Sequence, residues 1–171
     1  MYGYQAIEEY GIKERVGLGG IIKKNAGSFG THELNITSFA ADTSGLSDSI
    51  FFERGHNSKQ DSGVSNTENL SSYSASLSGS YPFSFKDNSF SKELIYRIGY
   101  ADQAAGVSDA TDNTRYSASL IYKNKISKDL SSKFIFERMQ IDNLAGEDAH
   151  DRSHTTGGLG LEYQKWNFGT T

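Results

Sequence analysis

The chain has 171 residues, enough for one domain with its own core, and its formal net charge of −4 leaves no basic surface for nucleic acid. Cysteine is absent, which excludes disulfides, thiolate catalysis and iron–sulfur ligation. The balance of 18 glycines, 10 tyrosines and 10 phenylalanines against one proline favours strands and turns, so an all-β fold is expected.

The sequence shows no helical membrane anchor and no signal peptide. No stretch approaches the roughly 20 apolar residues that a membrane-spanning helix needs, and the mean hydropathy is −0.56. Residues 1–10 have neither the basic start nor the apolar stretch of a secretion signal, so a signal lies outside this chain or the protein is not exported. The low hydropathy is compatible with an outer-membrane barrel, because half of each barrel strand faces a polar lumen.

Alternating apolar and polar residues between turn-forming segments predict seven strands in an antiparallel up-and-down meander. Their lengths are close to the roughly 9 to 11 residues that cross a bilayer at a tilt, which favours part of a transmembrane β-barrel. Connections alternate between mostly shorter ones (25–30, 82–91, 126–129) and mostly longer ones (42–68, 104–112, 143–153). The predicted strands are 13–24, 31–41, 69–81, 92–103, 113–125, 130–142 and 154–166.

A repeated phrase defines the two faces of these strands. Tyr-Ser-Ala-Ser-Leu occurs at 73–77 and again at 116–120. Because side chains alternate across a strand, the tyrosine, alanine and leucine lie on one face and the serines on the other. The same alternation predicts a lumen-facing and a lipid-facing set of residues in the other strands, with tyrosines near the ends of the apolar rows, where membrane barrels carry aromatic girdles.

The candidate lumen-facing residues are Arg15, Lys23, Glu33, Ser74, Ser76, Ser78, Arg97, Arg115, Ser117, Ser119, Lys123, Lys133, Glu137 and Glu162. The candidate lipid-facing residues are Val16, Leu18, Tyr73, Leu77, Tyr81, Leu94, Tyr96, Ile98, Tyr100, Tyr116, Leu120, Tyr122, Leu159, Leu161 and Tyr163. The strand at 130–142 separates less cleanly, since Phe134 and Phe136 share a face with Arg138. The inward charges would either set the ion preference of a pore or pair with one another to hold its wall together.

With these strands placed, the chain resembles part of a Gram-negative outer-membrane porin. The likeness rests on the short phrases at 29–34, 39–44, 100–106 and 159–163. It implies a passive channel in the outer membrane for small solutes or ions, without a cofactor or catalytic site. The implied contacts are with outer-membrane lipid, and a homo-oligomer is left open.

Two departures from the porin pattern suggest that residues 1–171 form a segment of a larger barrel. Bacterial single-chain barrels have an even number of strands, whereas seven are predicted here. Barrel proteins of this kind usually end on an aromatic residue, whereas this chain ends Gly169-Thr170-Thr171. The alternative is that residues 2–10 supply an eighth strand.

Other constellations in the sequence are better explained as structural. His150 and His154 are four residues apart, but they lie on a predicted loop entering a strand, so convergence on a metal is not expected. Gly17-Leu18-Gly19-Gly20 lies inside a strand and lacks the context of a nucleotide-binding loop. No nucleophile motif is present, so an enzyme is not expected. Seven carboxylates on the long loops are expected to form a plain acidic surface, with a cation site as the less favoured alternative: Asp102, Asp109, Asp112, Asp142, Glu147, Asp148 and Asp151.

Three other functions compete with the channel. A siderophore or nutrient receptor would use the same kind of wall in a larger barrel. A structural barrel would anchor the envelope without conducting. A soluble all-β binding or adhesion module would bury the Tyr and Leu rows between two sheets.

Overall fold

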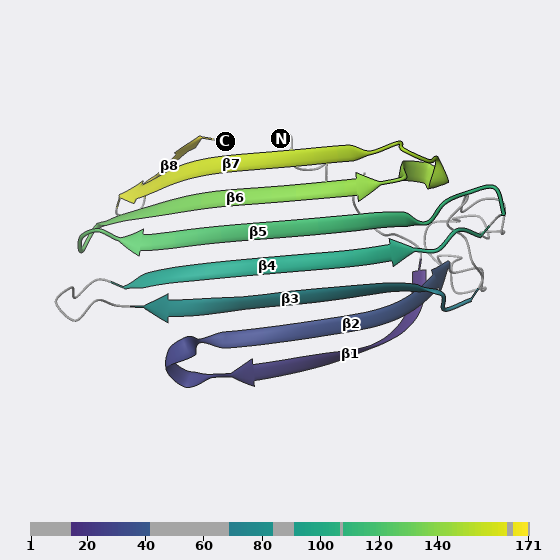
Figure 1. The fold of residues 1–171 in the computed structure, drawn as a ribbon. Coiled ribbons are helices and arrows are strands. Elements are labelled where there is room, and N and C mark those ends of the chain that lie inside the picture. Colours follow the sequence, from purple (N-terminus) through teal and green to yellow (C-terminus); the bar gives the residue numbers. More distant parts are fainter. Residues whose placement is uncertain (1–14, 42–68, 84–90, 107, 164–165, 171) are drawn as a thin grey trace, which may run out of the picture.

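The computed structural model describes residues 15–41, 69–83, 91–106, 108–163 and 166–170. The proposed extra strand at 2–10 and the long connection at 42–68 lie outside these residues. The described chain forms one antiparallel sheet of long strands, with two single-turn 3-10 helices in its connections (Figure 1). The strands are β1 (Arg15–Asn25), β2 (Thr31–Ala41), β3 (Ser72–Phe83), β4 (Lys92–Gln103), β5 (Asn113–Lys125), β6 (Leu130–Asp142), β7 (Arg152–Tyr163) and β8 (Trp166–Thr170).

The predicted all-β antiparallel meander is confirmed. Each strand pairs with the next one along the chain, in the order β1-β2-β3-β4-β5-β6-β7-β8. The seven predicted strands match β1 to β7 to within three residues at each end. β7 ends at Tyr163, three residues before the expected end near 166, and the short strand β8 then pairs antiparallel with it.

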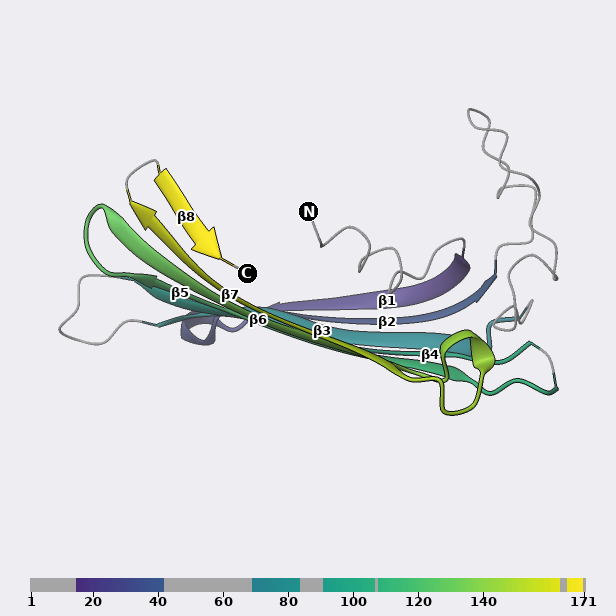
Figure 2. The same ribbon diagram turned by 90° about the horizontal axis from the view of Figure 1, so that it is seen from above.

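The sheet is open rather than closed on itself. In the part of the chain that the structure describes, β1 and β8 form its two edges and do not pair with each other. Figure 2 shows the sheet as a single twisted layer. The main contacts between described elements join neighbouring strands or join a single-turn helix to a strand, and no second layer of described residues packs on either face.

The described connections lie at two opposite ends of the sheet (Figure 1). At one end, the β1–β2 turn contains the 3-10 helix η1 (Gly27–Phe29), closed by a hydrogen bond from the Ala26 amide to the Gly30 carbonyl at 2.7 Å. Gly30 has a φ of 85°, and a Cβ there would collide with the Ser80 carbonyl, so only glycine fits. The β5–β6 turn lies at the same end, which we call the turn end; the other is the loop end.

Buried side chains gather toward the loop end of the sheet. Phe39, Ala101 and Ile141 are buried there, together with the polar side chains of Ser72 and Asn113. The 3-10 helix η4 (Leu144–Gly146) contributes to this region. The side-chain amide of Asn113 donates a hydrogen bond at 3.3 Å to the backbone carbonyl of Asn143, the residue just before η4. Most of the sheet away from this end is only partly covered, so its strands are held mainly by the hydrogen-bond ladder and by cross-strand side-chain pairs.

Candidate functional site: the two faces of the sheet

The strand registers sort the candidate residues onto opposite faces of the sheet. Side chains alternate along each strand, and paired residues on neighbouring strands lie on the same face. Together, these two rules place every residue of the candidate lipid-facing set on one face, which we call the apolar face. Every residue of the candidate lumen-facing set belongs to the opposite one, the polar face; Arg15 is placed there by its strand position alone. The pairings Leu34↔Leu77 and Leu77↔Ile98 show how the apolar rows continue from strand to strand.

Large aliphatic side chains on the apolar face are exposed. Leu18 is 76% exposed, Ile98 56% and Leu159 54%, although these residues lie on three different parts of the sheet. A soluble domain normally covers such a face with another layer, and contiguous exposed apolar surface of this kind marks an interaction with a partner or a membrane. Among the described residues no such layer is present.

Aromatic side chains form two clusters at opposite ends of the apolar face. Toward the loop end, the ring of Tyr100 lies 5.9 Å from that of Tyr73 and 5.2 Å from that of Tyr116. Toward the turn end, consecutive ring pairs join β1–β2, β3 and β5 at centroid distances of 6.4, 5.8 and 6.0 Å. The members of this turn-end cluster are Phe29, Tyr81, Phe83 and Tyr122.

The aliphatic centre of the face lies between these clusters. Tyr73 and Tyr81 stand about eight residues apart on β3, which corresponds to roughly 27 Å along the strand. Leu77 lies midway between them, level with Leu34 and Ile98. Along β3, the apolar face is therefore an aliphatic band with an aromatic border on each side.

A histidine and a tyrosine form one polar contact within the apolar face. His32 Nε2 donates a hydrogen bond to the Phe29 carbonyl at 3.0 Å, because a carbonyl can only accept. In the neutral ring, Nδ1 then accepts from the Tyr96 hydroxyl at 2.8 Å. Gly79 lies beneath the pair, and a Cβ there would come within 2.6 Å of His32 Nδ1 and 2.9 Å of the Tyr96 oxygen. A glycine is thus needed for these two polar groups to satisfy each other.

The register of β6 settles which residues of this strand share a face. Phe134 and Phe136 pair with Tyr122 and Leu120 of β5, so both belong to the apolar face. Arg138 belongs to the same face, opposite Ala118 on β5 and Thr155 on β7. It is exposed and lies on the loop-end side of the two phenylalanines, at the margin of the apolar rows on this strand.

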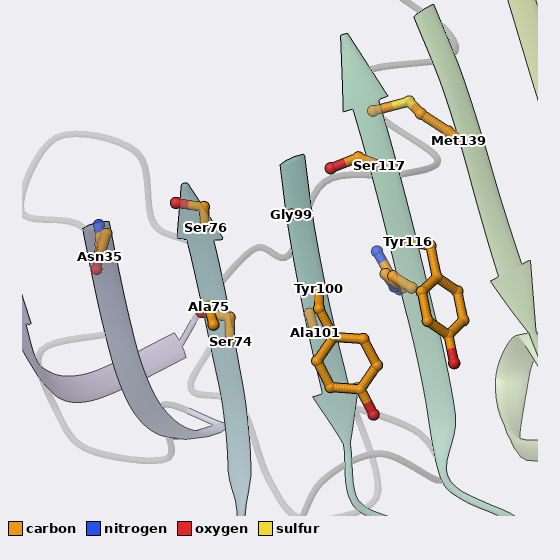
Figure 3. Close-up of a pocket in the computed structure, with 11 residues that line it drawn as sticks. Asn35, Ser74, Ala75, Ser76, Gly99, Tyr100, Ala101, Tyr116, Ser117 and Met139 are labelled. Atoms are coloured by element: carbon orange, nitrogen blue, oxygen red, sulfur yellow. The ribbon is translucent and has the colours of Figure 1, made fainter. Parts of the chain in front are cut away.

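Small polar side chains shape a shallow hollow on the polar face. Its volume is about 190 Å³, and its lining includes Ser74, Ser76, Gly99, Ser117 and Arg115 (Figure 3). Gly99 lies directly between Ser76 and Ser117 in the ladder, and a Cβ there would come within 2.5 Å of the Ser117 hydroxyl oxygen. The two copies of the repeated phrase therefore line the same hollow from two sides of β4, through Ser74 and Ser76 on β3 and Ser117 on β5.

Charged side chains on the polar face make contacts across neighbouring strands. Lys23 pairs with Glu33 at 3.3 Å, and Lys123 pairs with Glu93 at 3.1 Å. These lysines and glutamates are all more than a third exposed, so each pair contributes at most about 1 kcal/mol. Two further glutamates accept hydrogen bonds from serines instead: Glu137 from Ser119 at 3.4 Å and Glu162 from Ser131 at 3.5 Å.

The loop carboxylates mostly serve as acceptors for nearby backbone and side-chain groups. Asp112 accepts from the Ala105 amide at 2.8 Å, and Asp151 accepts from the Asn143 amide at 3.1 Å. Glu147 contacts His150 Nδ1 at 3.0 Å. His154, on β7, bonds instead to Thr156 at 2.9 Å, so the two histidines have different partners. Within the described residues, no group of three or more His, Cys, Asp or Glu side chains could hold a metal ion.

Sequence reasoning missed the alignment of isoleucines on the polar face. Ile95, Ile121 and Ile135 lie directly opposite one another on β4, β5 and β6, and each is half-buried. Each follows polar-face parity in its own strand and so looks like an isolated exception in the sequence. Only the register shows that they form a continuous row.

Among the residues that the structure describes, no helix is both long and apolar enough to span a membrane.

Comparisons with models of protein families, with curated proteins and with solved structures found no match to this chain.

Proposed function

We propose that this sheet is part of the wall of an outer-membrane β-barrel that lets small solutes or ions diffuse passively through a polar lumen. The observation that carries the proposal is the exposed aliphatic band between two aromatic clusters, on a face that no described layer covers. Outer-membrane barrels have an apolar band of about 25 Å between two aromatic girdles. The ring clusters of β3 to β5 lie on both sides of the exposed aliphatic centre, which matches this arrangement.

The slope of the apolar band across the sheet supports the same proposal. Leu18 on β1 is level with Tyr73 on β3, whereas Leu159 on β7 is level with Tyr81. Between these two edges, the band is thus displaced by about eight residues, or roughly 27 Å along the strands.

The displacement can be converted into an angle. Six strand spacings separate β1 from β7, or roughly 29 Å at 4.8 Å each, so the band crosses the strands at a slope of about 45°. Strands of membrane barrels tilt by about 35–45° from the barrel axis. When strands tilt by such an angle, an apolar band that crosses them at about the same angle lies parallel to the membrane plane. All parts of the band then lie at one depth in the bilayer.

The polar face would then line the lumen. Its serines and its Lys, Arg and Glu side chains can remain hydrated, and they exclude solutes by size and charge without forming a covalent intermediate. The serine-lined hollow widens the path locally, while the cross-strand ion pairs hold the charged side chains near the wall. The mechanism we propose is therefore steric and electrostatic, and it needs no catalytic residue or cofactor.

The proposal is tested with the full-length protein in a Gram-negative host. We expect it to fractionate with the outer membrane, to migrate differently in gels before and after heating, and to produce stepwise ion currents in planar bilayers. Stable monomers that purify without detergent would contradict the membrane wall and favour the soluble binding module. Folded protein that inserts but carries no current would contradict the channel and favour a structural barrel.

A further inference from the structure

The isoleucine row on the polar face lies between two rows that carry charge. Along their own strands, Ile95 lies between Glu93 and Arg97, and Ile135 lies between Lys133 and Glu137. Ile121 is likewise followed by Lys123. Same-face neighbours along a strand are about 7 Å apart, so at that spacing the half-buried apolar strip is bordered on one side by Glu93, Lys123 and Lys133 and on the other by Arg97 and Glu137.

The cations on the two sides of this strip are not fully neutralised. Lys123 pairs with Glu93 at 3.1 Å, but Lys133 stands directly opposite Lys123 in the ladder. On the other side, Arg97 lies between Ser78 and Ser119. Neither Arg97 nor Lys133 forms an ion pair within the described residues, and both are exposed. Two like charges directly opposite each other destabilise a sheet. The surface around Lys123 and Lys133 is therefore locally positive and favours a bound anion.

The polar face as a whole is positive, although the chain is negative. The strand residues of this face whose side chains the structure describes include seven Lys or Arg and four Glu, whereas the formal net charge of the chain is −4. Many of the compensating carboxylates lie at the loop end. The cations are Lys23, Arg97, Arg115, Lys123, Lys125, Lys133 and Arg152, and the carboxylates are Glu33, Glu93, Glu137 and Glu162.

We infer that the channel prefers small organic anions with an apolar body, such as aromatic or short aliphatic carboxylates. The isoleucine strip would contact the apolar body of the solute, and Arg97 or Lys133 would attract its carboxylate. Contact with an apolar strip adds a favourable hydrophobic contribution that a small hydrated anion cannot make. This inference rests on the proposed channel function, and it names the solute class that the channel carries.

The first test measures ion preference with the full-length protein in planar bilayers. Under a gradient of potassium chloride, we expect a reversal potential that indicates preference for anions. The double variant Arg97→Gln/Lys133→Gln should lower the anion-to-cation permeability ratio. Coulomb's law in water, for a unit charge about 7 Å away, gives a change of roughly threefold in the partition of each ion and so of roughly sevenfold in their ratio for each charge removed. Lys24→Gln is the matched control, because Lys24 is exposed but follows the parity of the apolar face, and it should leave the ratio unchanged.

The second test separates the apolar strip from the charges. Millimolar benzoate should reduce the chloride current more than acetate does. Ile121→Ser should remove the difference between benzoate and acetate but preserve the preference for chloride over potassium. The control Ile126→Ser changes an exposed isoleucine of the β5–β6 turn and should leave the difference intact. Heat-dependent gel migration verifies that each variant folds.

The outcomes separate this inference from the channel proposal. Currents that favour cations, or that respond equally to benzoate and acetate, overturn the inference and leave the channel proposal standing. An unchanged permeability ratio in the Arg97→Gln/Lys133→Gln variant also overturns it. Protein that inserts and folds but carries no current overturns the channel proposal, and the inference with it.

Discussion

The two faces of the sheet share one backbone and one set of strand pairings, yet their side chains interact differently. On the apolar face, contacts between strands are ring pairs such as Tyr100 with Tyr116 at 5.2 Å. On the polar face, they are ion pairs and hydrogen bonds such as Lys23 with Glu33 at 3.3 Å. The difference shows that the position of a residue along its strand, odd or even, decides which face its side chain joins. Substituting two adjacent residues of one strand therefore tests what each face contacts.

The largest effect should come from placing a charge on each face in turn. Leu77→Arg puts a guanidinium at the centre of the apolar band, and an arginine at the middle of a bilayer destabilises a membrane barrel by about 2–4 kcal/mol. Ser76→Arg is the matched control, because Ser76 is the preceding residue and belongs to the polar face. Urea unfolding in lipid vesicles measures both. Equal stability losses for the two variants would show that the faces do not have different surroundings.

A smaller effect is expected from the glycine beneath the His32–Tyr96 pair. Gly79→Ala would bring a methyl group within 2.6 Å of His32 Nδ1 and 2.8 Å of the Thr31 carbonyl. We expect a loss of about 1–3 kcal/mol from overpacking. The control is Gly157→Ala on β7, where an added Cβ has nothing within 4 Å and should be neutral or slightly stabilising. The free energy of unfolding checks both, and the prediction fails if Gly157→Ala is the more damaging change.

The aromatic border at the loop end provides a third comparison. Tyr100→Leu keeps an apolar side chain but removes the ring pairs with Tyr73 and Tyr116. Each pair of this kind contributes about 0.5–1.5 kcal/mol, so the variant should lose roughly 1–2 kcal/mol. Tyr163→Leu on β7 serves as control, because Tyr163 belongs to neither of the two aromatic clusters. Vesicle unfolding compares the two variants, and identical losses would argue against a paired aromatic border.

The smallest effect should come from breaking an ion pair on the polar face. Lys23→Gln removes the contact with Glu33, whose side chain is 37% exposed while that of Lys23 is 67% exposed. Such a pair contributes about 0.2–1 kcal/mol, and salt screens it. Urea unfolding at low and high ionic strength should therefore show a small loss that shrinks with salt. A loss above about 2 kcal/mol would mean that the polar face is far less hydrated than a water-filled lumen requires.

Much of the fold could be predicted because the relevant signal is local. The alternation at 73–77 and 116–120 identifies two strands and their faces without reference to any other part of the chain. The short strand β8 was missed because five residues next to a longer strand carry too little alternation to stand out. The sequence of β6 does not show which of its faces is the apolar one, because Phe134 and Arg138 lie on the same face of the strand. Only the pairing with β5 and β7 assigns that face.

The candidate site depended on information that no single strand contains. The sequence by itself determined which residues of one strand share a face, because side chains alternate along every strand with a period of two. Only the tertiary structure decided which residues stand level with one another, because register is set by pairing between strands. This pairing created the aromatic borders, the slope of the apolar band and the row formed by Ile95, Ile121 and Ile135. A shift of two residues in the β4–β5 register would keep both faces intact, but it would separate Ile95 from Ile121, move Tyr100 out of line with Tyr116 and change the slope of the band.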